Sequence, residues 1–446
     1  MESNAQQPTV KLSMEDNTLP IEKNALNWEA AKPAKGSARL LQSLFLKLLG
    51  RFTTGELTVI LPDGQHHCFG SSAEPKGLLK IHNTAFFKKV LFYGEIGFGE
   101  SYMEGDWSSP DVTGVLHCFI ANLETVPGMS GSKERFSLFN FLDVANRLYH
   151  WLRRNTRRNS RRNIQAHYDL SNEFYRLWLD PTWTYSSAYF ESPDQELAEA
   201  QQNKYRKLAR SLGLRPGMRV LEIGCGWGGF ALLAAREFGV HLTCITLSEE
   251  QLKLARERVT AAGLQDQIEV RLQDYREIEG QFDAIASIEM LEAVGHQYLR
   301  DYFQQCNRLL KPNGRLGLQV ILCPDSRYEA MRKSVDWIKR HIFPGGQLPS
   351  YAAIQKAVQS TGDLFLQGFD SFGNHYAQTL KIWRQHFNER LDSVYQLGFD
   401  ETFARKWDYY LAYCEAAFAS HNITVSQMVF SRPNNREFLL ETQPMR

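Results

Sequence analysis

A glycine-rich turn is the part of the sequence whose residues point most directly to chemistry. It reads EIGCGWGG at residues 222–229 and lies between a predicted strand, RVLEI, and a predicted helix. Glycine permits a tight turn and lets the backbone approach a ligand closely. Such a turn at the end of a strand in a doubly wound sheet binds nucleotide-like ligands. We therefore predict a nucleotide-binding loop with Gly224 and Gly226 against the ligand.

Two classes of ligand compete for this loop. The glycines also match the dinucleotide fingerprint, which requires a carboxylate at the end of the second strand to bind the ribose hydroxyls. That strand ends CITLS at residues 244–248, without a carboxylate. A carboxylate instead precedes the glycines, at Glu222, where it can accept hydrogen bonds from a bound ammonium group or hold the loop. S-adenosylmethionine carries such a group, so the residues favour it over NAD, and an NAD-dependent oxidoreductase is the disfavoured alternative.

A run of arginines at residues 153–162 is a second candidate for function. The arginines recur at helical spacing and would share one face of a helix; they are Arg153, Arg154, Arg157, Arg158, Arg161 and Arg162. An arginine near an anionic membrane surface contributes about 1 kcal/mol to binding. We expect this stripe to dock on an anionic membrane, and the alternative is a solvated linker helix.

The elements that must position these groups follow from the hydrophobic pattern. From residue 219 onward, predicted strands alternate with amphipathic helices, which indicates a doubly wound α/β domain with a parallel sheet and helices on both faces. Before it, an amphipathic helix at residues 38–52, a strand-turn-strand at 56–69 and further helical segments indicate a smaller α+β domain. The expected boundaries are a mobile tail at 1–36, a lipid- or membrane-associated α+β domain at 37–145, an arginine-rich linker helix at 146–164 and the cofactor domain at 165–446.

Composition limits the remaining classes. The net charge is only +1, which argues against a protein that coats nucleic acid, and the seven cysteines form no CxxC pair that would suggest a metal site. No stretch is long and apolar enough to span a bilayer, and the N-terminus lacks the pattern of a signal peptide. We therefore expect a cytoplasmic protein peripherally associated with the inner face of the membrane.

A series of longer motifs makes the prediction more specific. They read AHYDLSNEFY at 166–175, LDPTWTYSSAYF at 179–190, LEIGCGWGG at 221–229, ITLSEEQ at 245–251, LQDYRE at 272–277, IFPGGQLPS at 342–350, FGNHYAQTL at 372–380 and VSQMVFSR at 425–432. In this order they resemble cyclopropane fatty acid synthases and mycolic acid cyclopropane synthases. The segment FGESYMEGDW at 98–107 is similar to the smaller domain of that family. The resemblance covers nearly the whole chain and implies a class I methyltransferase fold, S-adenosylmethionine as the cofactor and a homodimer.

The resemblance also implies which residues bind the cofactor. Besides Glu222, these are Tyr185, Ser186, Gly224, Gly226, Thr246, Gln251, Asp274 and Tyr275. A hydroxyl at Thr246 and an amide at Gln251 can bind ribose in place of the missing carboxylate.

The reaction that the resemblance implies is methyl transfer to the double bond of an unsaturated acyl chain of membrane phospholipid. The resulting carbocation loses a proton to bicarbonate, which is expected to be held by Ser187, Glu292, Gln319, Ile321 and Tyr376. The family pattern would have cysteine at Ser187 and histidine at or near Ala293 and Gln319. A cyclopropane is the expected product and a methyl-branched unsaturated chain the alternative. A lipid-binding protein with an inactive methyltransferase fold and a small-molecule N-methyltransferase are weaker alternatives.

Overall fold

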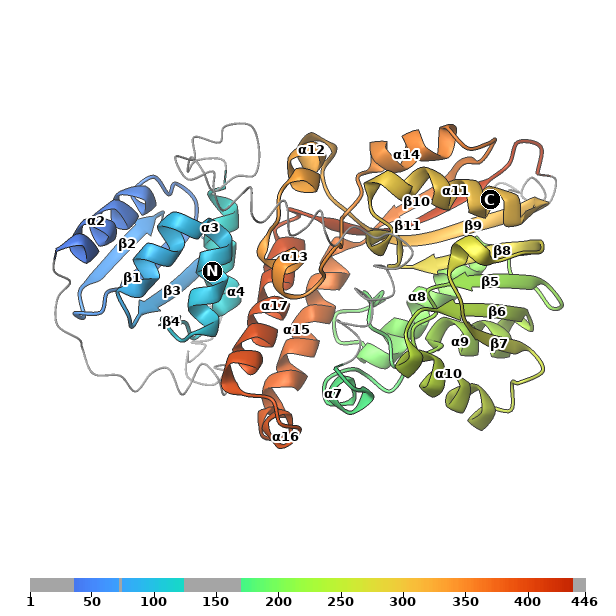
Figure 1. Cartoon of the computed structure of the whole chain (residues 1–446), viewed down its shortest axis with the longest axis horizontal. Helices are drawn as coiled ribbons and strands as arrows, with labels where there is room; N and C mark the ends of the chain where they lie inside the picture. Colours follow the sequence, from blue (N-terminus) through green and yellow to red (C-terminus); the bar gives the residue numbers. More distant parts are fainter. Residues whose placement is uncertain (1–35, 72–73, 124–169, 436–446) are drawn as a thin grey trace, which may run out of the picture.

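The computed structural model describes residues 36–71, 74–123 and 170–435, which form a small N-terminal domain and a larger α/β domain (Figure 1). The two domains lie at opposite ends of the molecule, with a layer of helices between them. The predicted tail up to residue 35 and the arginine-rich linker helix lie outside the described residues.

The N-terminal domain is an α+β unit, as the pattern of its sequence predicts. Its sheet has the order β2-β1-β3-β4, in which β1 pairs antiparallel with β2 and parallel with β3. The predicted strand-turn-strand forms β1 and β2. The elements are α2 (Ser37–Leu49), β1 (Glu56–Ile60), β2 (His66–Gly70), β3 (Lys76–Ile81), α3 (Ala85–Met103), β4 (Trp107–Ser108) and α4 (Val112–Ala121).

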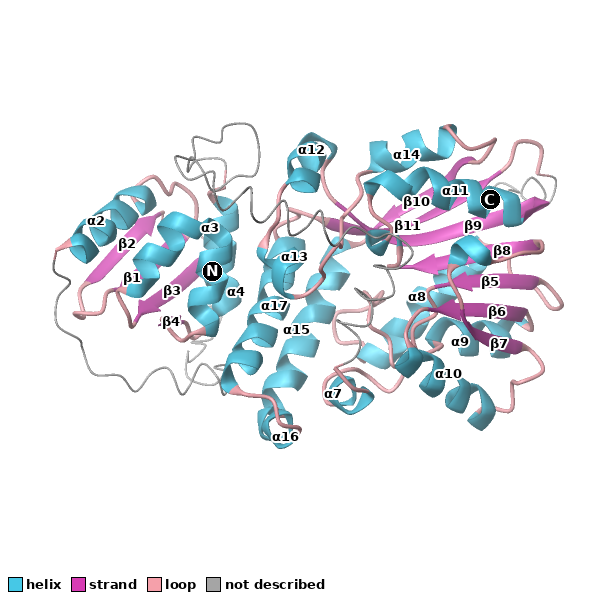
Figure 2. Cartoon of the chain, viewed as in Figure 1, coloured by secondary structure: helices cyan, strands magenta, loops and turns pink. Residues whose placement is uncertain are grey.

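The larger domain is built on a seven-stranded sheet of order β10-β11-β9-β8-β5-β6-β7 (Figure 2). The predicted strands β5 to β9 pair in parallel, and β11 is antiparallel to both of its neighbours. The strands are β5 (Arg219–Ile223), β6 (His241–Thr246), β7 (Ile268–Leu272), β8 (Phe282–Ile288), β9 (Leu310–Leu322), β10 (Phe365–Ser371) and β11 (Thr424–Ser431).

Helices cover both faces of this sheet, as predicted for a doubly wound domain. Successive residues of a strand point to opposite faces, and Val220 and Leu221 of β5 accordingly belong to two different hydrophobic clusters. One cluster is shared with α8 (Leu197–Ser211), α9 (Gly229–Phe238) and α10 (Glu249–Ala261). The other is shared with α11 (Leu299–Leu309) and α14 (Tyr351–Gln359).

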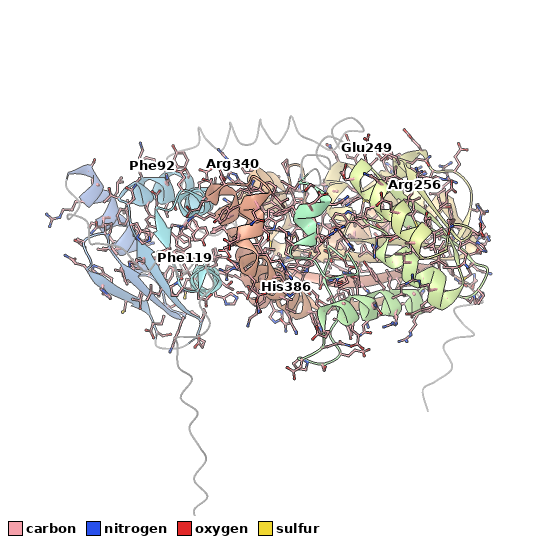
Figure 3. All side chains as sticks on the ribbon, turned by 90° about the horizontal axis from the view of Figure 1, so that it is seen from below. Phe92, Phe119, Glu249, Arg256, Arg340 and His386 are labelled. Carbon is pink, nitrogen blue, oxygen red and sulfur yellow. The ribbon has the colours of Figure 1, made fainter. Side chains whose placement is uncertain are left out.

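A helical layer joins the two domains. It consists of α15 (Gly373–Glu389), α16 (Leu391–Gln396) and α17 (Glu401–Ala419), and α17 contacts both α3 and α4 of the N-terminal domain. In Figure 3 this layer lies between Phe119 of the N-terminal domain and the α/β domain that carries Arg256, and His386 of α15 belongs to it. Arg384 and Asp408 form a buried ion pair (2.8 Å), and the Asp408 carboxylate also accepts a hydrogen bond from the hydroxyl of Tyr102 on α3 (2.7 Å). One continuous apolar core therefore runs from the N-terminal sheet to the helices beside the α/β domain.

Within the described ranges, none of the helices combines the length and the apolar character that crossing a bilayer requires.

Candidate active site

A pocket of about 950 Å³, including its open mouth, lies at the carboxyl ends of β5, β6 and β8. Ligands bind at this edge in doubly wound sheets because the loops that follow the strands meet there. The glycine turn after β5, the end of β6, the end of β8 and the segment 183–186 form its walls.

The structure gathers almost all of the predicted cofactor residues in this pocket. Those that line it are Tyr185, Ser186, Glu222, Gly224, Gly226, Thr246, Gln251 and Tyr275. Asp274 is not part of the lining, whereas its neighbour Gln273 is. The carboxylate of Asp274 accepts hydrogen bonds from the Arg276 side chain (2.5 and 2.8 Å).

The pocket has groups that fit S-adenosylmethionine. Glu222 is buried, and its Oε2 atom has no hydrogen-bond partner among the described residues. Burial raises the pKa of this carboxyl to about 8, and a bound ammonium group would stabilise its ionised form. Gly226 has a φ of 52°, and a Cβ atom added there would have no protein atom within 4 Å among the described residues. The backbone at Gly226 is therefore open to a ligand. Thr246 and Gln251 are already hydrogen-bonded to each other (2.8 Å) at the position expected for ribose.

Glu289 lies at the centre of the polar part of the pocket, although the sequence motifs did not identify it. It directly follows β8 and has a φ of 50°, which is rare for a residue with a side chain. Its Oε1 atom accepts hydrogen bonds from the Ser187 backbone N (2.9 Å) and from Gln319 Nε2 (2.7 Å). Its Oε2 atom accepts one from the hydroxyl of Tyr376 (2.7 Å). Strained backbone of this kind is concentrated at functional sites.

The electrostatics of Glu289 reflect two opposing influences. Burial raises its pKa, while the nearby Lys204 and the three hydrogen-bond donors lower it. Lys204, on α8, is fully buried and donates a hydrogen bond to Ser186 Oγ. Burial lowers the pKa of Lys204 to about 7, against the opposing influence of Glu289 and two further carboxyls. The site therefore combines a carboxyl group and an amino group that influence each other's protonation in a region of low dielectric constant.

The five residues predicted to form the base site divide into two groups. Ser187, Gln319 and Tyr376 converge on Glu289, whereas Glu292 and Ile321 bind each other. The Ile321 backbone N donates to Glu292 Oε1 at 2.5 Å, and Glu292 Oε2 has no partner among the described residues. Burial and the neighbouring Glu289 raise the pKa of Glu292 to about 8. Glu292 is not part of the pocket lining.

Aromatic rings surround the polar part of the site. Tyr185 packs between Trp178 (5.3 Å between ring centroids) and Trp383 (5.5 Å), and its hydroxyl is hydrogen-bonded to that of Tyr410 (2.7 Å). Tyr376 stacks on Phe418 of α17 (4.4 Å). Electron-rich ring faces in a dry pocket stabilise positive charge.

One signal in the sequence could have identified Glu289. Catalytic groups of doubly wound domains follow the carboxyl ends of the strands, and Glu289 lies near the end of the apolar run FDAIASIEML, directly after β8. The motif resemblance directed attention to Glu292, three residues later. No comparable signal marks Lys204, because a lysine in an amphipathic helix ordinarily faces solvent.

Comparisons with known proteins agree with this geometry. The family model described as mycolic acid cyclopropane synthetase matches residues 155–428. The chain is 39% identical over 425 residues to the tuberculostearic acid methyltransferase UfaA1 of Mycobacterium tuberculosis, covering 91% of this chain and 95% of the relative. It is 35% identical over 359 residues to the cyclopropane-fatty-acyl-phospholipid synthase of Escherichia coli K12, covering 79% and 87%.

Solved structures show the same similarity. The mycolic acid cyclopropane synthase CmaA1 complexed with SAH and CTAB superimposes with a TM-score of 0.56 at 32% identity. The match covers 61% of this chain and 98% of that one.

Proposed function

The chain belongs to the mycolic acid cyclopropane synthetase family and is an S-adenosylmethionine-dependent methyltransferase, and we propose that it methylates the double bond of unsaturated acyl chains in membrane phospholipid. The Escherichia coli relative is named a cyclopropane-fatty-acyl-phospholipid synthase, which supports this substrate class. The aromatic surroundings of the pocket support it as well, because an alkene brings no charge or hydrogen bond and must be bound by apolar contacts.

The observation that carries the proposal is the position of Glu289. Three groups that the resemblance assigns to a bound bicarbonate ion, Ser187, Gln319 and Tyr376, donate instead to this carboxylate. Their hydrogen bonds are therefore already used by the protein. We assign the role of proton acceptor to Glu289 and derive no step through bicarbonate.

The cofactor supplies an electrophilic methyl group when it is bound. Glu222 would orient the cofactor by accepting hydrogen bonds from the cofactor's ammonium group, and the backbone at Gly226 would allow the cofactor to approach closely. The rings around Tyr185 exclude water and stabilise the positive charge that the acyl chain acquires when it is methylated. Glu289, on the polar side of the same pocket, then accepts a proton from the acyl chain and becomes a neutral carboxylic acid, which Tyr376 and Gln319 hold in place.

The proposed product is a methyl-branched unsaturated chain. Loss of a proton from a carbon next to the cation gives an unstrained alkene, whereas ring closure requires a base held at the added methyl group and away from the neighbouring carbons. The departures from the cyclopropane synthase pattern at Ser187, Ala293 and Gln319 change the surroundings of the base. The relative that matches nearly the whole chain is named for tuberculostearic acid. A barrier difference of only about 1.4 kcal/mol changes the product ratio tenfold.

A cyclopropane chain is the second candidate product. The family itself and the name of the Escherichia coli relative favour it. Both products share the methyl transfer and the proton acceptor, so the choice between them does not affect the assignment of Glu289.

We place the protein peripherally at the inner face of the membrane, as a homodimer. On α2, Leu40 (71% exposed) and Leu44 (47%) lie on the open face. Lys47 is exposed in the last turn of the helix, and Arg51 is exposed just after its end. An exposed apolar strip with basic residues beside it suits an anionic lipid surface.

Product analysis tests the proposed function. The protein is expressed in a host whose phospholipids contain monounsaturated chains, and the fatty acid methyl esters are analysed by gas chromatography with mass spectrometry and by proton NMR. A gain of one CH₂ mass with a retained vinyl signal supports the methyl-branched alkene. Upfield ring protons indicate the cyclopropane, and an unchanged lipid profile contradicts the proposal.

A further inference from the structure

Helix α8 anchors the segment that carries Ser186 and Ser187. Three of its residues, spaced three and four apart on one face, make these contacts: Gln201 Nε2 donates to the Ser186 carbonyl (2.9 Å), Lys204 Nζ donates to Ser186 Oγ, and the Tyr205 hydroxyl is hydrogen-bonded to Thr184 Oγ1 (2.9 Å). The next residue of the segment, Ser187, donates its backbone N–H to Glu289. This face of α8, which is not part of the sequence motifs, therefore holds the segment whose Ser187 backbone N–H is one of the three hydrogen-bond donors to Glu289.

Lys204 is the one member of this face with a charge, and its surroundings are unusual. Its side chain is fully buried, and its Nζ lies 4.4 Å from the centroid of the Tyr205 ring on its own helix. The negative charges of three carboxyls on other elements raise the pKa of Lys204 against the effect of burial: Glu289 after β8, Asp180 in the segment after α7 (Asn172–Arg176) and Glu222 at the end of β5. Asp180 and Glu222 are buried and Glu289 is half-buried, and desolvation raises the pKa of each.

A buried carboxyl without a cation nearby is normally protonated at neutral pH, and a protonated carboxyl cannot accept a proton. Glu289 has neutral donors at Ser187, Gln319 and Tyr376, and Glu292 on the same turn is a further acid. Among the described residues around Glu289, Lys204 is the group whose positive charge favours its ionised form.

We propose that Lys204 is a positioning residue whose buried ammonium group fixes Ser186 and keeps the Glu289 carboxylate ionised, so that it is ready to accept the proton released from the methylated acyl chain. This inference rests on the proposed function, because it assumes that Glu289 is the acceptor. It assigns a charge role to a residue that is not part of the pocket lining.

The experiment is a pH profile of methyl transfer to unsaturated phospholipid vesicles for the wild type and three variants. Lys204→Met removes the charge, Lys204→Arg keeps it, and Ser186→Ala removes the hydrogen bond while leaving the charge. Arg210→Met is the matched control, because Arg210 is an exposed basic residue on the same helix. Circular dichroism checks that each variant is folded, and calorimetry measures cofactor affinity.

Without Lys204, the pKa of Glu289 rises, so the acid limb of the profile moves to higher pH. We expect a shift of about 1 pH unit or more for Lys204→Met, with no such shift for Lys204→Arg or Arg210→Met. Ser186→Ala lowers the rate at every pH without moving the limb. A folded Lys204→Met variant whose rate falls equally at all pH values, or does not fall, overturns the proposal.

A replacement variant and an infrared measurement complete the test. Lys204→Gln replaces Lys204→Met if the latter does not fold. Infrared difference spectra of wild type against Glu289→Gln report directly whether Glu289 is ionised at pH 7, and a protonated Glu289 overturns the inference even where no lysine variant folds. A wild type that leaves the lipids unchanged contradicts the proposed function, whereas infrared difference spectra recorded in the Lys204→Met background still test whether Lys204 keeps Glu289 ionised.

Discussion

The hydroxyl of Tyr376 on α15 donates a 2.7 Å hydrogen bond to Oε2 of Glu289. Glu289 lies 87 positions earlier in the chain and directly follows β8, a central strand of the sheet. This contact connects the helical layer to the nucleotide-binding sheet at the point where the two form the site. The Glu289 carboxylate occupies the donors that the family resemblance reserves for an anion, and for this reason we propose it as the proton acceptor.

The glycine turn can be tested by adding a side chain on the ligand side. Gly226→Val should abolish binding of S-adenosylmethionine in calorimetry, because the new atoms enter the space that the cofactor requires. A valine at positive φ also costs about 1–2 kcal/mol in stability. Gly263→Val is the matched control, since Gly263 also has a positive φ (68°) with nothing within 4 Å but lies after α10, away from the pocket. Equal cofactor affinity in the two variants would show that the pocket is wrongly assigned.

The raised pKa of Glu292 predicts how the free energy of unfolding depends on pH. Its pKa is about 8 in the folded protein because of burial and the neighbouring Glu289, whereas the unfolded chain ionises near the ordinary glutamate value. Between pH 5 and pH 7 the unfolded state therefore loses a proton that the folded state keeps, and the free energy of unfolding falls by up to about 1.4 kcal/mol per pH unit. Glu292→Gln should remove this part of the slope.

Chemical denaturation of the apo-protein at pH 5, 6 and 7 measures this slope. The range stops at pH 7 because Lys204, whose pKa is about 7, acts in the opposite direction above it. Glu279→Gln, at an exposed position, serves as the control. An unchanged slope in Glu292→Gln would mean that Glu292 is ionised in the folded protein.

The arginine stripe at residues 153–162 lies outside the described residues and stays a prediction from the sequence. Replacing Arg153, Arg154, Arg157 and Arg158 by Gln should weaken co-sedimentation with anionic vesicles, since each arginine contributes about 1 kcal/mol at such a surface. Added salt should weaken binding of the wild type in the same way. Binding that responds to neither change would indicate a solvated linker.

The sequence predicts the elements that depend on local patterns. Strands β5 to β9 have short apolar runs, and the turn after β5 is defined by glycines at positions where φ is positive, such as Gly224 and Gly226. Eight cofactor residues taken from the motifs line one pocket. Glu222, Gly224, Gly226 and Thr246 lie at the carboxyl ends of β5 and β6, where the doubly wound fold determines their positions, whereas Tyr185 and Ser186 precede α8 and Gln251 lies on α10.

The parts that the sequence does not predict depend on contacts between distant segments. The role of Tyr376 requires α15 to pack beside the end of β8, and nothing in the local pattern of either element states this pairing. Glu289 and Glu292 are three residues apart in one segment, and only the fold decides which carboxyl enters the pocket. Lys204 is buried and lies against the segment that carries Ser186. The helical pattern of α8 alone would place this lysine in solvent, and only the packing of the distant segment shows otherwise.

The central claim is that Glu289 accepts the proton lost from a methylated acyl chain, and one labelling measurement tests it most directly. A host expressing the wild type or Glu289→Gln is supplied with methionine carrying a trideuterated methyl group, and the fatty acids are analysed by mass spectrometry. We predict that wild-type products carry all three deuterium atoms, because the lost proton comes from the chain, and that Glu289→Gln reduces product by about 100-fold or more while its cofactor affinity is retained. Labelled product at the wild-type level in Glu289→Gln would contradict the assignment of the proton acceptor, and products with only two deuterium atoms would contradict the proposed branched alkene.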